Sequence, residues 1–195
     1  ESVDAAILIA DIVGFTSRSE KMDPTRVVQE LNHYFSYIDP VIEAHDGVLD
    51  KRMGDGVMVV FVPRGGESPE SVRRRALRCG LALLRTVDLN NPISEARGIA
   101  PIEIRVGIAA GPTVQGNIGS DAQIEYTVIG DTVNLGSRLE SRAAPGHLMI
   151  TDALFDAAEA EDLRMTHVTR RESLRIRGRD QAQQTVELQP HFETG

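Results

Sequence analysis

The sequence is poor in cysteine and has no long apolar segment. A single cysteine, Cys79, excludes an internal disulfide framework and suits a reducing compartment such as the cytosol. No apolar run approaches the roughly 20 residues of a membrane-spanning helix, and the N-terminus lacks a signal-peptide pattern. We therefore expect a cytoplasmic segment that makes no membrane contact of its own.

Basic residues are fewer than acidic ones. The chain carries 21 Lys and Arg against 29 Asp and Glu, which gives a formal net charge of −8. The longest basic tract is Arg73-Arg74-Arg75, and a solvated helix face accounts for it. A nucleic-acid polymer is therefore not an expected partner. The 5 histidines show no metal-ligand spacing, so none of them is assigned a role.

The length fits one domain with its own core. A chain of 195 residues with 41% hydrophobic residues can bury a sizeable interior, and no internal repeat or second domain is visible. The sequence starts at Glu1, almost directly on a predicted strand. We therefore expect a domain excised from a longer protein, which leaves open a membrane anchor or a sensor upstream.

The predicted elements follow the order strand, helix, strand, strand, helix, strand. The strands cover residues 3–10, 48–52, 57–62 and 102–110. The first helix begins at Asp23-Pro24 and has apolar positions up to Ile42, and the second begins at Ser68-Pro69 and ends before Asn90-Asn91-Pro92. This order predicts an α+β fold with a ferredoxin-like βαββαβ core, an antiparallel sheet with helices packed on it. Beyond this core, Gly111 and Gly116 punctuate short strands. The chain then continues as a C-terminal α/β extension, which has a strand at 124–129, a helix with Asp131 as its N-cap, and later short elements.

Two aspartates mark a candidate site. Asp11 follows the apolar run 5–10, and Asp55 lies at the tip of the hairpin turn 53–56. In the predicted topology, the end of the first strand and the hairpin turn share one edge of the sheet, so the two carboxylates become neighbours. Carboxylates that converge suit a hard cation that arrives with substrate phosphates. Gly14 follows Asp11 where backbone amides can approach an anion, so we predict a nucleotide site.

Several separated motifs together resemble one known family. These are 11–16 (DIVGFT), Lys51 with Gly54-Asp55, and 130–134 (GDTVN) with Ser137-Arg138. In this order and at these intervals they are similar to the class III nucleotidyl cyclase catalytic domain. The resemblance covers nearly the whole chain, so residues 1–195 are expected to form a single domain of this kind.

The resemblance implies a role for each matching position. Asp11 and Asp55, assisted by the backbone carbonyl of Ile12, would bind two Mg²⁺ or Mn²⁺ ions per active site. Lys51 and Thr127 fall at the purine-selecting positions. Asn134 would orient the ribose, and Arg138 would stabilise the transition state. The backbone amides of Val13, Gly14, Phe15 and Thr16 would bind the β- and γ-phosphates. Arg177, or alternatively Arg179, would also contact the phosphates.

The implied activity is that of an adenylyl cyclase, acting as a head-to-tail homodimer with two shared sites. Cyclisation requires the 3′-hydroxyl of ATP to attack its own α-phosphorus while pyrophosphate leaves, and two cations assist both sides of that reaction. An ammonium at Lys51 and a hydroxyl acceptor at Thr127 complement adenine, although a hydroxyl can also donate. Threonine at this position resembles a bacterial subgroup, some of whose members respond to bicarbonate. The alternatives are a guanylyl cyclase and a catalytically silent module that binds nucleotide.

Overall fold

The structure is a computed structural model that describes residues 2–120, 123–178 and 180–192. The elements follow one another along the chain as β1 (Ser2–Ile12), α1 (Phe15–Ser19), α2 (Pro24–Ala44), β2 (Val48–Met53), β3 (Gly56–Phe61), α3 (Pro69–Ala96), β4 (Ile104–Ser120), β5 (Gln123–Ile129), α4 (Asp131–Arg142), β6 (Leu148–Thr151), α5 (Asp152–Ala157), α6 (Ala160–Leu163), β7 (Thr166–Leu174) and β8 (Gln183–Pro190). No helix among the described residues is long and apolar enough to cross a membrane.

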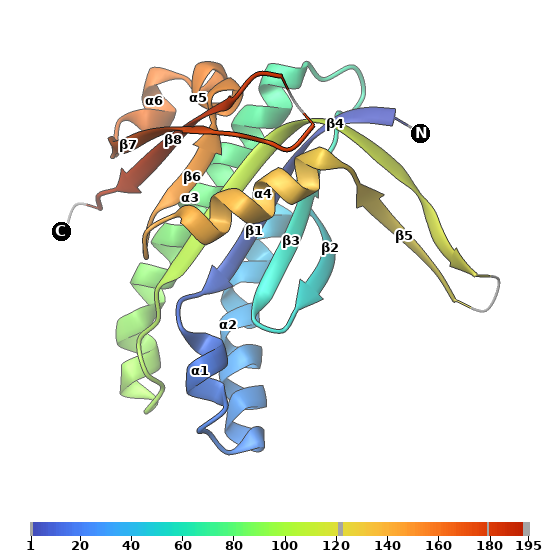
Figure 1. Cartoon of the computed structure of the whole chain (residues 1–195). Helices are drawn as coiled ribbons and strands as arrows, with labels where there is room; N and C mark the ends of the chain where they lie inside the picture. Colours follow the sequence, from blue (N-terminus) through green and yellow to red (C-terminus); the bar gives the residue numbers. More distant parts are fainter. Residues whose placement is uncertain (1, 121–122, 179, 193–195) are drawn as a thin grey trace.

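The predicted ferredoxin-like core is confirmed. Its strands lie in the order β2-β3-β1-β4, and each adjacent pair is antiparallel. The C-terminal part continues the sheet, because β6 pairs with β4 in parallel and is followed by β8 and β7 (Figure 1). The hairpin β2–β3 therefore lies at one end of the sheet, and its turn reaches the edge where β1 ends.

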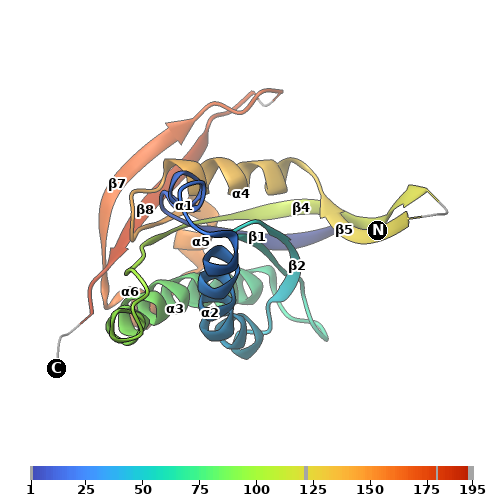
Figure 2. The same ribbon diagram turned by 90° about the horizontal axis from the view of Figure 1, so that it is seen from below.

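Helices cover both faces of the sheet. Figure 2 shows α2 and α3 on one face and α4 on the other. In β1 the even-numbered residues 6–10 pack in the cluster that α2 and α3 cover, and the odd-numbered residues 5–9 belong to the opposite cluster. All six are buried, as expected for a continuous apolar strand in the middle of a sheet.

The helix starts follow from capping residues. Asp23 accepts a hydrogen bond from the amide of Thr25 at 2.9 Å, and Ser68 accepts one from the amide of Ser71 at 3.2 Å. A proline follows each of these caps. The prediction for α4 was wrong by one residue, because Gly130 is the N-cap and Asp131 is the first helical residue.

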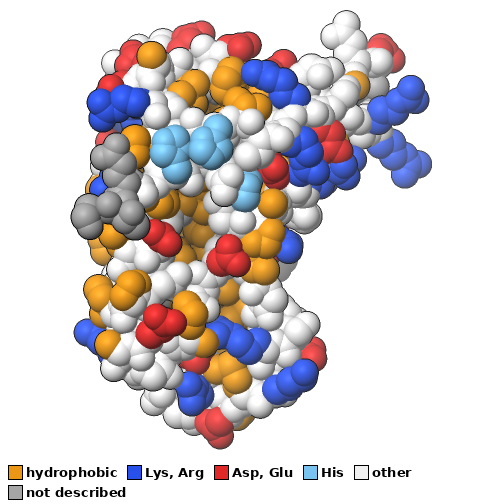
Figure 3. Space-filling view, turned by 90° about the vertical axis from the view of Figure 1, so that its left-hand side faces the viewer, with side chains coloured by type: hydrophobic (Ala, Val, Ile, Leu, Met, Phe, Trp, Pro, Cys, Tyr) orange, Lys and Arg blue, Asp and Glu red, His pale blue; other side chains and the backbone are white. Residues whose placement is uncertain are grey.

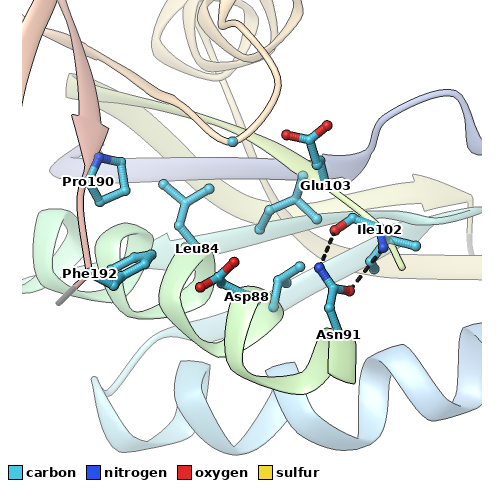
Figure 4. A pocket seen from close by; sticks show the side chains of 10 residues that line it. Leu84, Asp88, Asn91, Ile102, Glu103, Pro190 and Phe192 are labelled. Carbon is cyan, nitrogen blue, oxygen red and sulfur yellow. Dashed lines mark hydrogen bonds between the residues drawn. The ribbon is translucent and has the colours of Figure 1, made fainter. Parts of the chain in front are cut away.

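The predicted end of α3 was wrong. The helix continues through Pro92 to Ala96, beyond the asparagines that were expected to stop it. The side chain of Asn91 accepts from the amide of Ile102 and donates to its carbonyl oxygen, both at 2.9 Å (Figure 4). Ser94 lies 2.8 Å from the ring of His33 in α2. These tertiary contacts hold the last turn in place and offset the hydrogen bond that Pro92 cannot donate.

The fourth strand is also longer than predicted. Instead of short strands separated by Gly111 and Gly116, β4 runs without interruption to Ser120. Its second half pairs with β5 to form a two-stranded arm that extends away from the body (Figure 1). Pairing between β4 and β5 continues along the arm through Gly116, so the glycine does not break the ladder.

Helix α4 lies directly on the backbone of the sheet. A side chain at Gly107 of β4 would place its Cβ 2.2 Å from the amide nitrogen of Glu140 and 2.6 Å from the carbonyl oxygen of Gly136. A Cβ at Gly136 would lie 3.4 Å from the carbonyl oxygen of Ile7. Glycines on the two elements therefore permit this close approach, and the close approach determines the rotation of α4 about its axis.

We expect Gly107→Ala to lower the free energy of unfolding by about 1–3 kcal/mol or more, because the added methyl group collides with backbone that cannot move aside. Gly116→Ala is the matched control on the same strand, since its Cβ would meet nothing within 4 Å. Urea denaturation of both variants measures the difference. Equal stabilities would show that α4 does not depend on this contact.

Candidate active site

The hairpin turn brings Asp55 to the end of β1. Gly54 adopts a left-handed conformation with φ of 63°, which allows the tight turn between β2 and β3. Oδ2 of Asp55 accepts a hydrogen bond of 2.9 Å from the amide of Ile12. Asp55 thus lies beside the residue that follows Asp11, as the topology predicted.

Asp11 points to the face of the sheet that α4 covers. It continues the odd-numbered series of β1, is half-buried, and pairs across the strands with Arg105 of β4. Glu140 of α4 is buried near it, and its carboxyl interacts with that of Asp11. Burial raises the pKa of Glu140 well above its ordinary value, the charge of Asp11 raises it further, and Arg105 opposes the shift.

The same negative charge acts on Asp55. Burial raises the pKa of Asp55, the hydrogen bond from Ile12 lowers it, and the neighbouring charge of Asp11 raises it. Among the described residues, no ion pair is formed by Asp11 or Asp55, and no group of three or more His, Cys, Asp or Glu side chains has metal-binding geometry. Two carboxylates without a cationic partner suit Mg²⁺ or Mn²⁺, which is often bound by one or two carboxylates together with substrate phosphates. The donor set therefore fits a divalent cation.

The predicted phosphate loop needs one correction. The amide of Val13 donates to the carbonyl oxygen of Glu103 at 2.9 Å and is not available for a phosphate. Gly14 has φ of 68° and is the N-cap of α1, and Phe15 and Thr16 are the first residues of that helix. The first amides of a helix have no partner within it. The candidate cradle is therefore limited to Gly14, Phe15 and Thr16.

The two predicted purine-selecting residues meet at a third residue. Oγ1 of Thr127 donates a hydrogen bond of 2.8 Å to Oδ2 of Asp50, and Nζ of Lys51 lies 3.6 Å from the same oxygen. Lys51 belongs to β2 and Thr127 to β5. The structure thus brings together two residues that are far apart in the sequence.

Asn134 and Arg138 lie four residues apart in α4 and are both exposed, so they share its outer face. Nη2 of Arg138 donates to the carbonyl oxygen of Arg175 at 3.2 Å. Arg177 lies exposed in the segment between β7 and β8, two residues beyond that contact, and Arg179 lies outside the described residues. Glu140 and Gly136 occupy the inner face of α4, so the helix separates Asp11 from this second group.

Two carboxylates of this region received no role from the sequence. Glu140 lies two residues after Arg138 and is buried towards Asp11. Its position four residues after Gly136, on the same face of α4, is the sequence feature that could have indicated this burial. Asp50 lies at a shift in the β2–β3 register, between Leu49 and Lys51, and no sequence pattern indicates that shift.

Two cavities lie apart from these residues. One of about 170 Å³ is enclosed mainly by α3, the start of β4 and Phe192, and Figure 4 shows Leu84 and Asp88 at its wall. A second one lies between α3 and the C-terminal segment, where His191 lines it and stacks on His167 with ring centroids 4.7 Å apart. Figure 3 shows the face on which histidines gather. No predicted site residue lines either cavity.

Comparisons with known proteins agree with this arrangement. The family model for the adenylate and guanylate cyclase catalytic domain matches residues 1–189. Adenylate cyclase 1 of Rhizobium meliloti (strain 1021) is 34% identical over 137 residues, which are 70% of this chain and 20% of that protein. The chain therefore spans about a fifth of the length of that relative.

Solved structures agree as well. The guanylyl cyclase Cya2 has a TM-score of 0.84 and 32% identity, covering 100% of this chain and 95% of that one. The adenylyl cyclase CyaB from P. aeruginosa has a TM-score of 0.85 and 27% identity, covering 99% and 97%. With the family model matching nearly the full length, this chain belongs to the family of adenylate and guanylate cyclase catalytic domains.

Proposed function

We propose that this domain converts ATP into 3′,5′-cyclic AMP and pyrophosphate. The observation that carries the proposal is the contact between Asp55 Oδ2 and the amide of Ile12, because it places two carboxylates at one edge in a chain of the cyclase family. The names of the R. meliloti relative and of CyaB support ATP as the substrate.

Asp11 and Asp55, with the backbone carbonyl of Ile12, would hold two Mg²⁺ or Mn²⁺ ions. When bound, these ions would lower the pKa of the 3′-hydroxyl and neutralise negative charge on the triphosphate. Burial, and to a smaller extent the charge of Asp11, raises the pKa of Asp55, and a bound divalent cation would offset both effects. The amides of Gly14, Phe15 and Thr16 would bind the β- and γ-phosphates.

Arg138 and Asn134 would act on the reacting part of the nucleotide. The guanidinium of Arg138 can stabilise the charge that develops on the α-phosphate, and the amide of Asn134 can hold the ribose so that its 3′-hydroxyl lies in line. Arg177 would contribute a further positive charge to the phosphates. Exposure of all three side chains supports a role towards a ligand outside this chain's own core.

We infer that each site is shared between two copies of the chain. Asp11 lies beneath the inner face of α4, whereas Asn134 and Arg138 are exposed on its outer face, so one chain cannot readily surround a single ATP with both groups. Two-fold symmetry would pair the aspartates of one protomer with Lys51, Thr127, Asn134 and Arg138 of its partner and create two equivalent sites.

The similarity to Cya2, a guanylyl cyclase at 32% identity, makes GTP the second candidate substrate. Chromatography of the products after incubation with ATP or GTP and Mn²⁺ tests both. We expect cyclic AMP as the main product. Cyclic GMP as the main product would identify a guanylyl cyclase, and bound nucleotide without either product would identify a silent module.

We expect Asp55→Ala to lower turnover at least about a hundredfold, because the variant loses a metal ligand. The loss in stability should be near 1 kcal/mol, since the amide of Ile12 loses its acceptor at a half-buried edge. Activity across a Mn²⁺ titration and thermal denaturation measure the two effects. Glu161→Ala, which removes an exposed carboxylate paired with Arg164, is the control. Near-normal activity of Asp55→Ala would contradict the metal assignment.

Mixing two inactive variants tests the shared site. Asp55→Ala and Arg138→Ala each damage both sites of their own homodimer, but a mixed dimer contains one site with every wild-type group. Random exchange makes half of the dimers mixed, each with one intact site, so we expect about a quarter of the wild-type activity. Mixed dimers that demonstrably form and yet stay inactive would overturn the shared arrangement.

A further inference from the structure

Asp50 lies at an irregularity in the edge strand β2. In the pairing of β2 with β3, Leu49 faces Val59 and Lys51 faces Met58, so Asp50 is an extra residue without a partner of its own. Such a bulge re-aims side chains, and bulges often lie beside active sites. In a regular strand, Asp50 and Lys51 would point to opposite faces. Here Oδ2 of Asp50 is 3.6 Å from Nζ of Lys51, so both reach the same place.

The same oxygen accepts the hydroxyl proton of Thr127. A carboxylate has no proton to give, so in the 2.8 Å contact between Oγ1 of Thr127 and Oδ2 of Asp50 the hydroxyl must be the donor. The side chain of Asp50 and the residue Thr127 are each only 7% exposed. Water therefore competes little for this bond, and the single proton of Thr127 stays directed at Asp50.

This hydrogen bond removes the ambiguity of the threonine hydroxyl. A free hydroxyl can donate to O6 of guanine as readily as it accepts from the N6 amino group of adenine. With its proton held by Asp50, Thr127 can only accept. Guanine would then place an acceptor against an acceptor, which is the kind of mismatch that a polar site rejects.

We propose that Asp50 is a positioning residue for base selection, which makes Thr127 an acceptor beside the donor Lys51. The inference rests on the proposed function, because it assumes that Lys51 and Thr127 meet the purine. It adds to that function a physical reason why a threonine at this position favours ATP over GTP.

The test compares kcat/KM for ATP and for GTP in Asp50→Asn and in the wild type. The amide of the new side chain can donate to Thr127 and free the hydroxyl proton for guanine O6. We therefore expect the ATP-to-GTP ratio to fall about tenfold. Asp50→Glu, which keeps an acceptor, should restore part of the ratio. Equal loss with both nucleotides would show that Asp50 only supports the strand, and would overturn the proposal.

A double-mutant cycle separates positioning from general damage. In a Thr127→Val background there is no hydroxyl to orient, so Asp50→Asn should leave the ratio unchanged there. An equal shift in both backgrounds would contradict the proposed route through Thr127. Asp39→Asn is the matched control, because it removes another ion pair to β2, the 2.6 Å contact with Arg52, and should not alter the ratio.

Binding measurements keep this test independent of turnover. Equilibrium titration with non-hydrolysable α,β-methylene analogues of ATP and GTP reports base preference even without catalysis. A wild-type chain that binds the ATP analogue more tightly but makes no cyclic AMP would contradict the proposed function alone. Loss of that binding preference in Asp50→Asn would still support the role of Asp50, and an unchanged preference would overturn it.

Discussion

The close contact between α4 and the sheet is the constraint on which the site depends. With no Cβ at Gly107, the backbone of α4 can approach β4 until Glu140 and Gly136 lie directly on it. This contact determines which side of the helix faces inwards. It places Glu140 near Asp11, and it leaves Asn134 and Arg138 exposed.

Carboxylates gathered at one edge carry an electrostatic cost. Asp11, Asp55 and Glu140 lie in a partly buried region, and the pKa of both Asp55 and Glu140 is raised by burial and by the charge of Asp11. A divalent cation would offset this cost, so the same arrangement that costs stability in the free protein favours metal binding. Sites with perturbed carboxylates are often functional for this reason.

The group formed by Asp50, Lys51 and Thr127 shows how an irregular strand can bring distant side chains together. The bulge in β2 turns Asp50 towards Lys51, and β5 brings Thr127 to the same carboxylate oxygen. A threonine hydroxyl has no inherent preference between donating and accepting. Here its direction is set by Asp50, which accepts its proton.

The sequence by itself determined the core of the fold and the pairing of the aspartates. The continuous apolar run of β1, the cap at Asp23 and the hairpin turn are local patterns, and rules of chain topology then place Asp11 beside Asp55. Only the tertiary structure decided that α3 passes through Pro92 and that the amide of Val13 is occupied.

The tertiary structure also decided the orientation of Glu140 and the hydrogen bond between Thr127 and Asp50. The reason is physical, because side-chain periodicity and capping depend on neighbours within a few residues. The bond from Thr127 to Asp50, by contrast, joins residues 77 positions apart. Its existence depends on how elements pack and on where a strand departs from regular pairing.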